Sequence, residues 1–200
     1  MGRVKALLLV AILFLGVTYV AAASGGETKN DLGVVVGYVW PSSDSTINGI
    51  KFEADSTIDY GVEYKHRFLA SNRLSVGGTV LFANYDAKAA GTKFGDIDNT
   101  MFLVDANWHF LANKALYVGA TLGYSDWGNL DVQGVGGVNT KSNTVYGLNL
   151  GYDIPIGKRW AILTNLRYLS QKVETDVSGG GNISVDVNPI IANVGFAWRF

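Results

Sequence analysis

Ionisable side chains recur at every second position along much of this chain, and they are the groups that could do chemistry. Successive side chains of a β-strand point to opposite faces, so residues of one parity share a face. In the strand-like segments described below, the odd-numbered face carries four acids and four bases, a balance that favours mutual pairing over an ion pathway. We expect a charge network formed by Asp59, Glu63, Lys65, Arg67, Asp105, His109, Asp153, Arg167 and Arg199.

Nucleophilic catalysis would need a Ser, Cys or His that is activated by a base and oriented by a carboxylate. The chain has no Cys, and its two histidines, His66 and His109, each precede a short turn. In an outer-membrane barrel such turns lie at the periplasmic end, far from a lipid substrate in the outer leaflet. We therefore predict no catalytic residue and no enzymatic activity.

Two other motifs are weak candidates for ligand sites. The glycine-rich Gly134–Gly137 lacks the Gly-Lys-Ser/Thr ending of a phosphate-binding loop. The acidic Asp96–Asn99 lacks the glycine turn and the distal Glu of a calcium loop, so a solvated loop is favoured over a cation site. No metal and no cofactor are predicted.

The elements that carry these side chains are strands with an apolar even-numbered face. A Lys or Arg that faces lipid at the bilayer midplane costs about 2–4 kcal/mol, so the even face must meet the hydrocarbon and the odd face the lumen. This polarity excludes a lipocalin-type soluble barrel, which has an apolar interior. The fold class is an all-β, eight-stranded, antiparallel up-and-down transmembrane β-barrel with strands over residues 32–40, 58–64, 74–82, 102–110, 116–124, 146–154, 162–168 and 190–200.

The N-terminal segment has the pattern of a secretory signal. Arg3 and Lys5 precede an apolar run from Ala6 to about Val20, and small residues, Ala21–Ala23, stand before Ser24. We predict a cleaved signal peptide over residues 1–23 and a barrel over 24–200, the alternative being a retained transmembrane helix. Loss of Arg3 and Lys5 leaves 14 bases against 17 acids, a net charge of −3, and nothing suggests a nucleic-acid partner.

The connections alternate in length, which sets the orientation. Residues 69–72, 111–114 and 155–159 form short turns, whereas residues 41–56, 86–98, 126–142 and 171–184 form longer polar connections. Short turns face the periplasm, so both termini are predicted to be periplasmic in the outer membrane of a Gram-negative-type bacterium. The outward aromatics then form a lower and an upper girdle. The lower girdle is Phe68, Trp108, Phe110, Trp160, Trp198 and Phe200, and the upper girdle is Tyr38, Trp40, Tyr60, Phe82, Tyr124, Tyr146 and Tyr168.

The inward residues also sort by height, with charges toward the periplasm and apolar groups toward the outside. An eight-stranded barrel is wide enough only for its own side chains or for one small ligand. Pro189 lacks the N–H of a strand ladder, so it predicts either a weak lateral seam in the wall or merely the start of pairing. The expected apolar pocket, which could instead be simple packing, consists of Val39, Leu81, Met101, Leu103, Val145, Leu169, Val187 and Ile191.

Four segments resemble the outer-membrane protein W (OmpW) family, within the wider group of small eight-stranded outer-membrane proteins. They are Gly37–Pro41, Leu116–Tyr124, Val185–Pro189 and Gly195–Phe200. The resemblance implies a narrow channel that passes small hydrophobic molecules. Together with the weak seam expected at Pro189, this predicts passage across, or laterally into, the outer membrane. The alternative is a structural or adhesin-like barrel that presents its long loops and transports nothing.

The C-terminal strand carries a further expectation. Phe196, Trp198 and Phe200 alternate outward and end on an aromatic residue, which resembles the terminal signal read by the barrel assembly machinery. The resemblance implies that this machinery and periplasmic chaperones are partners, together with outer-membrane lipid.

Overall fold

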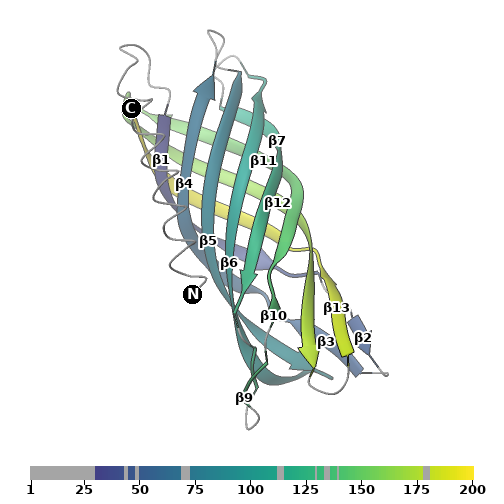
Figure 1. The fold of residues 1–200 in the computed structure, drawn as a ribbon. Coiled ribbons are helices and arrows are strands. Elements are labelled where there is room, and N and C mark those ends of the chain that lie inside the picture. Colours follow the sequence, from purple (N-terminus) through teal and green to yellow (C-terminus); the bar gives the residue numbers. More distant parts are fainter. Residues whose placement is uncertain are drawn as a thin grey trace.

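In the computed structural model, the chain folds into one antiparallel β-barrel (Figure 1). The structure describes residues 30–42, 45–47, 50–68, 73–111, 115–128, 130–132, 136–138, 140–177 and 181–200, so the predicted signal peptide lies outside the described residues. Among the described residues, no helix is long and apolar enough to span a bilayer.

The strands follow the predicted alternation and are rich in the β-branched and aromatic residues that favour this conformation. Their bounds are β1 Asn30–Trp40, β2 Ser45–Ile47, β3 Ile50–Ala54, β4 Thr57–Phe68, β5 Leu74–Ala89, β6 Thr92–His109, β7 Leu116–Trp127, β8 Leu130–Val132, β9 Gly136–Val138, β10 Thr140–Lys141, β11 Asn143–Ile156, β12 Trp160–Val177, β13 Gly181–Val187 and β14 Ile190–Arg199.

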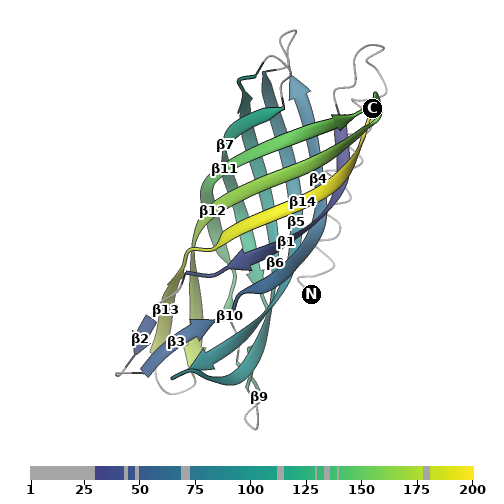
Figure 2. The ribbon, with the colours of Figure 1, turned by 180° about the vertical axis from the view of Figure 1, so that it is seen from behind.

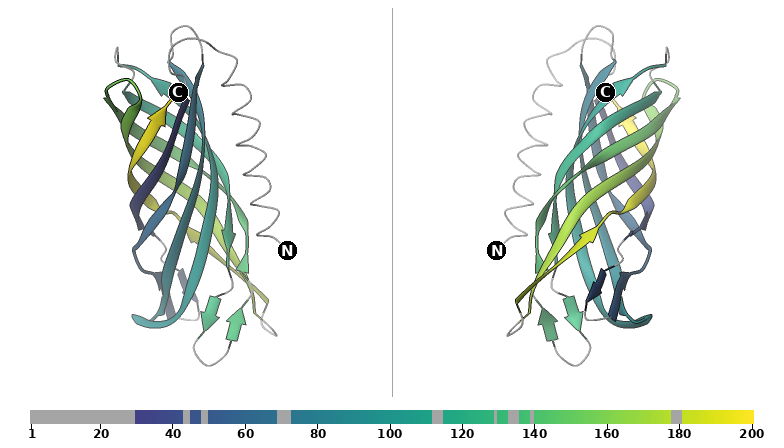
Figure 3. Two further views of the ribbon diagram at one scale, coloured as in Figure 1. Left: turned by 90° about the vertical axis from the view of Figure 1, so that its left-hand side faces the viewer. Right: turned by 90° about the vertical axis from the view of Figure 1, so that its right-hand side faces the viewer.

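Eight of these strands close into a ring, in the order β5-β4-β1-β14-β12-β11-β7-β6, which returns to β5 through the β5–β6 pairing. Ring neighbours are antiparallel, and the chain passes through the eight ring strands in order. The additional strands β2 and β3, β8 to β10, and β13 lie between consecutive ring strands, and β13 continues into β14 through Asn188 and Pro189. The predicted eight-stranded up-and-down barrel is thus confirmed (Figure 3).

The two faces of the wall differ as the alternation predicted. Large apolar residues of even number are 37–64 % exposed along the outer surface, whereas odd-numbered side chains fill the lumen. With the outer surface in hydrocarbon, the backbone hydrogen bonds of the closed ring leave no sheet edge at membrane depth.

The chain ends of the described barrel meet at one rim. The backbones of Asn30 and Phe200 exchange two hydrogen bonds of 2.9 Å, which close β1 onto β14. We call this rim the terminal end, and the opposite rim, where β2, β3, β8, β9, β10 and β13 extend past the ring, the far end (Figure 2).

The strands run further toward the far end than the sequence predicted. Residues 86–98 were expected to form a loop, but β5 and β6 continue through them to a turn at Ala90–Gly91, where both residues have positive φ. This geometry is that of a tight two-residue hairpin turn. Likewise, most of residues 171–184 belongs to the β12–β13 pair. Outside the membrane the outward face need not be apolar, so hydropathy alternation fades while the hydrogen-bonded ladder continues.

Candidate functional site

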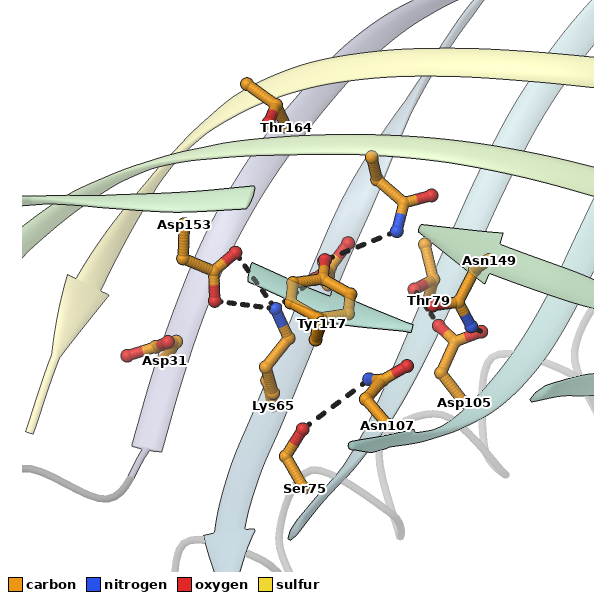
Figure 4. Close-up of polar contacts among 12 residues, drawn as sticks. Asp31, Lys65, Ser75, Thr79, Asp105, Asn107, Tyr117, Asn149, Asp153 and Thr164 are labelled. Atoms are coloured by element: carbon orange, nitrogen blue, oxygen red, sulfur yellow. Dashed lines mark hydrogen bonds and ion pairs between the residues drawn. The ribbon is translucent and has the colours of Figure 1, made fainter. Parts of the chain in front are cut away.

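The lumen near the terminal end holds a cluster of ion pairs. Lys65 of β4 donates to both carboxylate oxygens of Asp153 on β11, at 3.1 and 2.9 Å, and its Nζ lies 3.4 Å from Glu63 (Figure 4). Arg67 bridges Asp153 at 3.1 Å and Asp31 at 2.6 Å. Opposite charges from β1, β4 and β11 therefore meet across the barrel interior.

Tyr117 of β7 fills the space beside this cluster. Its ring lies 4.1 Å below the Lys65 ammonium, a cation–π contact, and its hydroxyl accepts a hydrogen bond of 3.2 Å from Asn165. A Cβ at position 151 would overlap this ring, so Gly151 makes room for it. His109 lies against Tyr117 with ring centroids 5.0 Å apart and contacts Ser75 at 2.9 Å, so it joins the cluster through neutral partners.

Arg167 of β12 forms a second node, nearer the middle of the lumen. Its Nη2 lies 3.0 Å from Asp105, 3.3 Å from Glu63 and 3.1 Å from the Thr79 hydroxyl. The other oxygen of Asp105 accepts from Thr121 at 2.6 Å and from Asn149 at 3.2 Å. A buried charge pair is stabilised when its remaining lone pairs and protons are satisfied. These neutral side chains do that for Asp105, whereas the Nε of Arg167 has no partner among the described residues.

Asp59 differs from the other predicted members of the network because its direct partner is an amide. Both of its oxygens accept from Asn193, at 2.9 and 3.0 Å, and Arg167 reaches the same Asn193 at 3.3 Å. A Cβ at Gly37 would overlap both Asp59 and Asn193, so the glycine allows this approach. Asp59 thus lies where the charged side chains of the lumen end and the apolar ones, which continue toward the far end, begin.

The nine residues of the predicted charge network, together with the side chains that bond to them, form what we call the floor. The structure brings all nine predicted network residues into the lumen, and apart from Arg199 each is at most 6 % exposed. Arg199 is half-buried and forms an ion pair with Asp31, with Nε and Oδ1 3.2 Å apart. Linked side chains from β1, β4, β6, β11 and β12 thus reach toward one another across the lumen at this level.

Sequence reasoning missed Asp31, which raises the acids of the network to five against four bases. Its odd number was the available signal, but the predicted first strand began at Leu32. The structure starts β1 at Asn30, one residue before this acid.

The predicted apolar pocket residues occupy the lumen between the floor and the far end. Seven of the eight, all except Val187, are at most 2 % exposed and pack into one cluster with residues such as Val35, Ala83, Tyr85, Ile97 and Trp127. Val187 is buried but lies outside this cluster. We call the part of this cluster between the floor and the far end the far-end core; its other members Ala161, Leu163 and Ala197 lie toward the terminal end.

Pro189 interrupts the pairing of β12. Before it, Val187 pairs with Gln171, and after it, Ile190 pairs with Tyr168. Leu169 donates to the Pro189 carbonyl at 3.0 Å, but the reciprocal bond is missing because proline has no N–H. On the β12 side, pairing therefore continues before and after Pro189.

On its other side, Pro189 lies where the β1–β14 ladder stops. The last pair is Trp40 with Ile190, and beyond it one backbone bond of 3.2 Å joins Asn188 to Ser42. Among the described strands, β13 then pairs only with β12, and β2 only with β3. We call the place bounded by Ser42, Asn188 and Pro189 the seam.

Charges outside the barrel are solvated. Lys93 bridges Asp86 at 2.8 Å and Asp96 at 2.6 Å, and its hydrogen bond lowers the pKa of the Asp86 carboxyl. Among the described residues, no three His, Cys, Asp or Glu side chains are grouped to hold a metal.

An apolar outer surface with aromatic rims, wrapped around a polar interior, defines an integral β-barrel of the bacterial outer membrane. A protein-family model described as "outer membrane protein beta-barrel domain" matches residues 7–200, and the chain belongs to this family. No curated protein matches the sequence.

Solved structures give the same fold. OprG from Pseudomonas aeruginosa matches with a TM-score of 0.70 at 16 % identity over 88 % of this chain and 98 % of its own. AlkL in lipid bilayers gives 0.60 at 16 % over 88 % and 93 %, and Neisserial surface protein A gives 0.59 at 15 % over 88 % and 99 %. These solved structures are small outer-membrane β-barrels, and with the family match they confirm the resemblance to small outer-membrane barrel proteins expected from the sequence.

Proposed function

We propose that the protein is a narrow conduit that takes small hydrophobic molecules from the cell exterior and releases them sideways into the outer membrane. The observation that carries this proposal is the division of the lumen into a charged floor and an apolar far-end core. In the proposed orientation, the terminal end faces the periplasm and the far end faces outward.

The floor argues against passage along the barrel axis. A solute would have to separate Arg167 from Glu63 and Asp105, and Lys65 from Asp153. Breaking one such buried pair costs about 3–5 kcal/mol, and an apolar solute offers no compensating contacts. The far-end core instead offers a solute apolar surroundings, worth about 25 cal/mol for each Å² of apolar surface removed from water.

The seam supports a lateral exit. Elsewhere in the ring, leaving sideways would break several ladder bonds, whereas Ser42 and Asn188 are joined by one. Ile191 of the far-end core follows Pro189 by two positions, so the apolar interior adjoins this stretch of wall.

An engineered disulfide tests the exit. The chain has no Cys, so Ser42→Cys with Asn188→Cys introduces a single bridge between backbones that already share a hydrogen bond. Antiparallel partners of this kind have Cα atoms about 5.5 Å apart, within the range of disulfides. We expect oxidation to slow uptake of a hydrophobic tracer by vesicles and reduction to restore it.

The matched control is Asn84→Cys with Asp98→Cys, a pair in the continuous β5–β6 ladder. Asn84 lies two positions past the girdle residue Phe82, as Ser42 does past Trp40. Oxidation of the control should leave uptake unchanged. Equal uptake by the oxidised and reduced seam variant would refute the lateral route.

A second candidate is a barrel that presents its far end to other surfaces without transport. It is favoured by the β5–β6 and β12–β13 hairpins, which continue the ladder to Ala89–Thr92 and Val177–Gly181 and so give the far end a regular framework. Shortening both hairpins should abolish binding of such a protein to its target surface, but should leave much of the uptake by a conduit.

We also propose that the last strand directs assembly. Phe196 and Trp198 face outward, and Trp198 stacks on Phe200 with centroids 4.6 Å apart. An aromatic row at the terminal end is what the barrel assembly machinery, supplied by periplasmic chaperones, would recognise in the unfolded chain.

A further inference from the structure

Three buried polar side chains near the far end have no hydrogen-bond partner among the described residues. They are Tyr85, Trp127 and Gln171, which are 1, 6 and 2 % exposed. The Tyr85 hydroxyl, the Trp127 indole N–H and both polar atoms of the Gln171 amide are unpaired. The floor differs, because each of its amides and charged groups keeps at least one hydrogen bond or ion pair.

The three side chains lie at one level of the barrel. Each follows an outward girdle aromatic on its own strand by three positions: Tyr85 follows Phe82, Trp127 follows Tyr124, and Gln171 follows Tyr168. At about 3.3 Å per residue along a strand, this places all three just past the upper girdle. An entering solute would meet this level before the floor.

Two of them are in contact, and the third lies on the opposite wall from Tyr85. The rings of Tyr85 and Trp127 are in contact, with centroids 5.5 Å apart. Gln171 lies on β12, four strands from β5 in either direction around the ring. It stands between Leu169, a member of the far-end core, and Val173, which packs against that core.

An unpaired buried polar group carries its desolvation penalty, and a partner that enters the site relieves it. The indole N–H is only a donor, the hydroxyl donates and accepts, and the amide does both. Most groups around them are apolar, and the buried polar neighbours Asn99 and Ser125 are hydrogen-bonded to each other. A complementary molecule therefore needs an apolar body and an oxygen that accepts hydrogen bonds.

We propose that this level of the lumen binds small neutral molecules that combine an apolar body with one hydroxyl or carbonyl group, in preference to hydrocarbons of the same size. The inference rests on the proposed conduit function and names its class of solute. Entry requires the packed Tyr85–Trp127 pair to separate, because neither ring is exposed.

Benzyl alcohol and ethylbenzene test the proposal, because they have equal numbers of heavy atoms and differ in a hydroxyl against a methyl group. Binding of each is measured by calorimetry on the full barrel in lipid nanodiscs, with empty nanodiscs as the reference. Tyr85→Phe, Trp127→Phe and Gln171→Met each remove polar atoms and keep an apolar side chain.

We expect wild type to bind benzyl alcohol more tightly than ethylbenzene, relative to empty nanodiscs. Loss of one hydrogen bond should weaken benzyl alcohol binding about fivefold in at least one variant, and binding of ethylbenzene should not change. The control, Tyr146→Phe, removes a hydroxyl from the outer surface and should change neither.

The outcomes separate the two proposals. If ethylbenzene binds at least as tightly, or if all three variants keep wild-type affinity for benzyl alcohol, the inference is wrong while the conduit stands. If neither probe binds wild type, both proposals fail. Tyr85→Phe and Gln171→Met should also unfold no more easily than wild type, because each removes unpaired polar atoms and keeps most of the side-chain volume; a clear loss of stability would show that the group is paired and overturn the inference. Trp127→Phe does not enter this comparison, because the smaller ring leaves a cavity in the core whether or not the indole N–H is paired.

Discussion

Replacing Arg167 by methionine tests the floor directly. Methionine keeps much of the side-chain volume but removes the cation that contacts both Glu63 and Asp105, at 3.3 and 3.0 Å. Two carboxylates then remain buried near each other, and Asn193 and Thr79 each lose a contact. Removing one partner of a buried pair costs about 3–5 kcal/mol. Since Asp105 keeps Thr121 and Asn149, we expect a loss near the lower limit, about 3 kcal/mol.

The assay is urea unfolding of the barrel in lipid vesicles, followed by tryptophan fluorescence and by heat-modifiable electrophoretic mobility. A triple variant with Arg167→Met, Glu63→Gln and Asp105→Asn removes all three charges and should recover most of the loss, because a neutral packed cluster carries no unpaired charge. The control is Lys172→Met. Lys172 and Asp186 are exposed with their charges 3.9 Å apart, so its removal should cost less than about 1 kcal/mol.

The reasoning about the floor is refuted if Arg167→Met unfolds at the same urea concentration as wild type. It is also refuted if the triple variant is no more stable than the single one. Either result would mean that the charges are hydrated in the membrane-embedded protein.

Three further perturbations follow from the same geometry. Ile191→Arg places a cation in the far-end core and should reduce hydrophobic-tracer uptake by vesicles, and an unchanged rate would count against the pocket. Gly151→Ala forces a Cβ against the Tyr117 ring and should lower the free energy of unfolding by about 1–3 kcal/mol. Gly78→Ala, where a Cβ would lie 4.0 Å from the Leu103 carbonyl oxygen without overlap, should cost less, and equal losses would contradict the packing argument. Phe200→Asp should lower the amount of membrane-inserted protein without changing the heat-modifiable mobility of what remains, and an unchanged yield would argue against a terminal recognition signal.

The sequence predicted the ring and the direction of each side chain because both depend on one local property, the period of two. Parity alone placed Arg167 and Asp105 inside, since a charge on the outer surface would face hydrocarbon. The particular partners could not be predicted in this way. Which acid meets Arg167 depends on the stagger of strands that are distant in the sequence.

Two errors have the same physical origin. The expected loop over residues 86–98 is a hairpin, because past the girdle the outward residues Asn84 and Asp98 meet water and the hydropathy signal ends. Asp31 was missed because the predicted strand was bounded by apolar residues. Parity would also have placed Tyr85 and Gln171 inside, but the absence of a partner among the described residues depends on closeness in space, which the alternation does not report.

The central claim is that an apolar solute passes through the wall while the floor keeps ions out. The most direct measurement follows two quantities in the same vesicles: uptake of a hydrophobic tracer into the lipid, and potassium efflux from the interior. The outer leaflet of these vesicles is lipopolysaccharide. The account predicts that inserted wild-type protein speeds tracer uptake and leaves potassium retained. Potassium efflux without faster tracer uptake would contradict it.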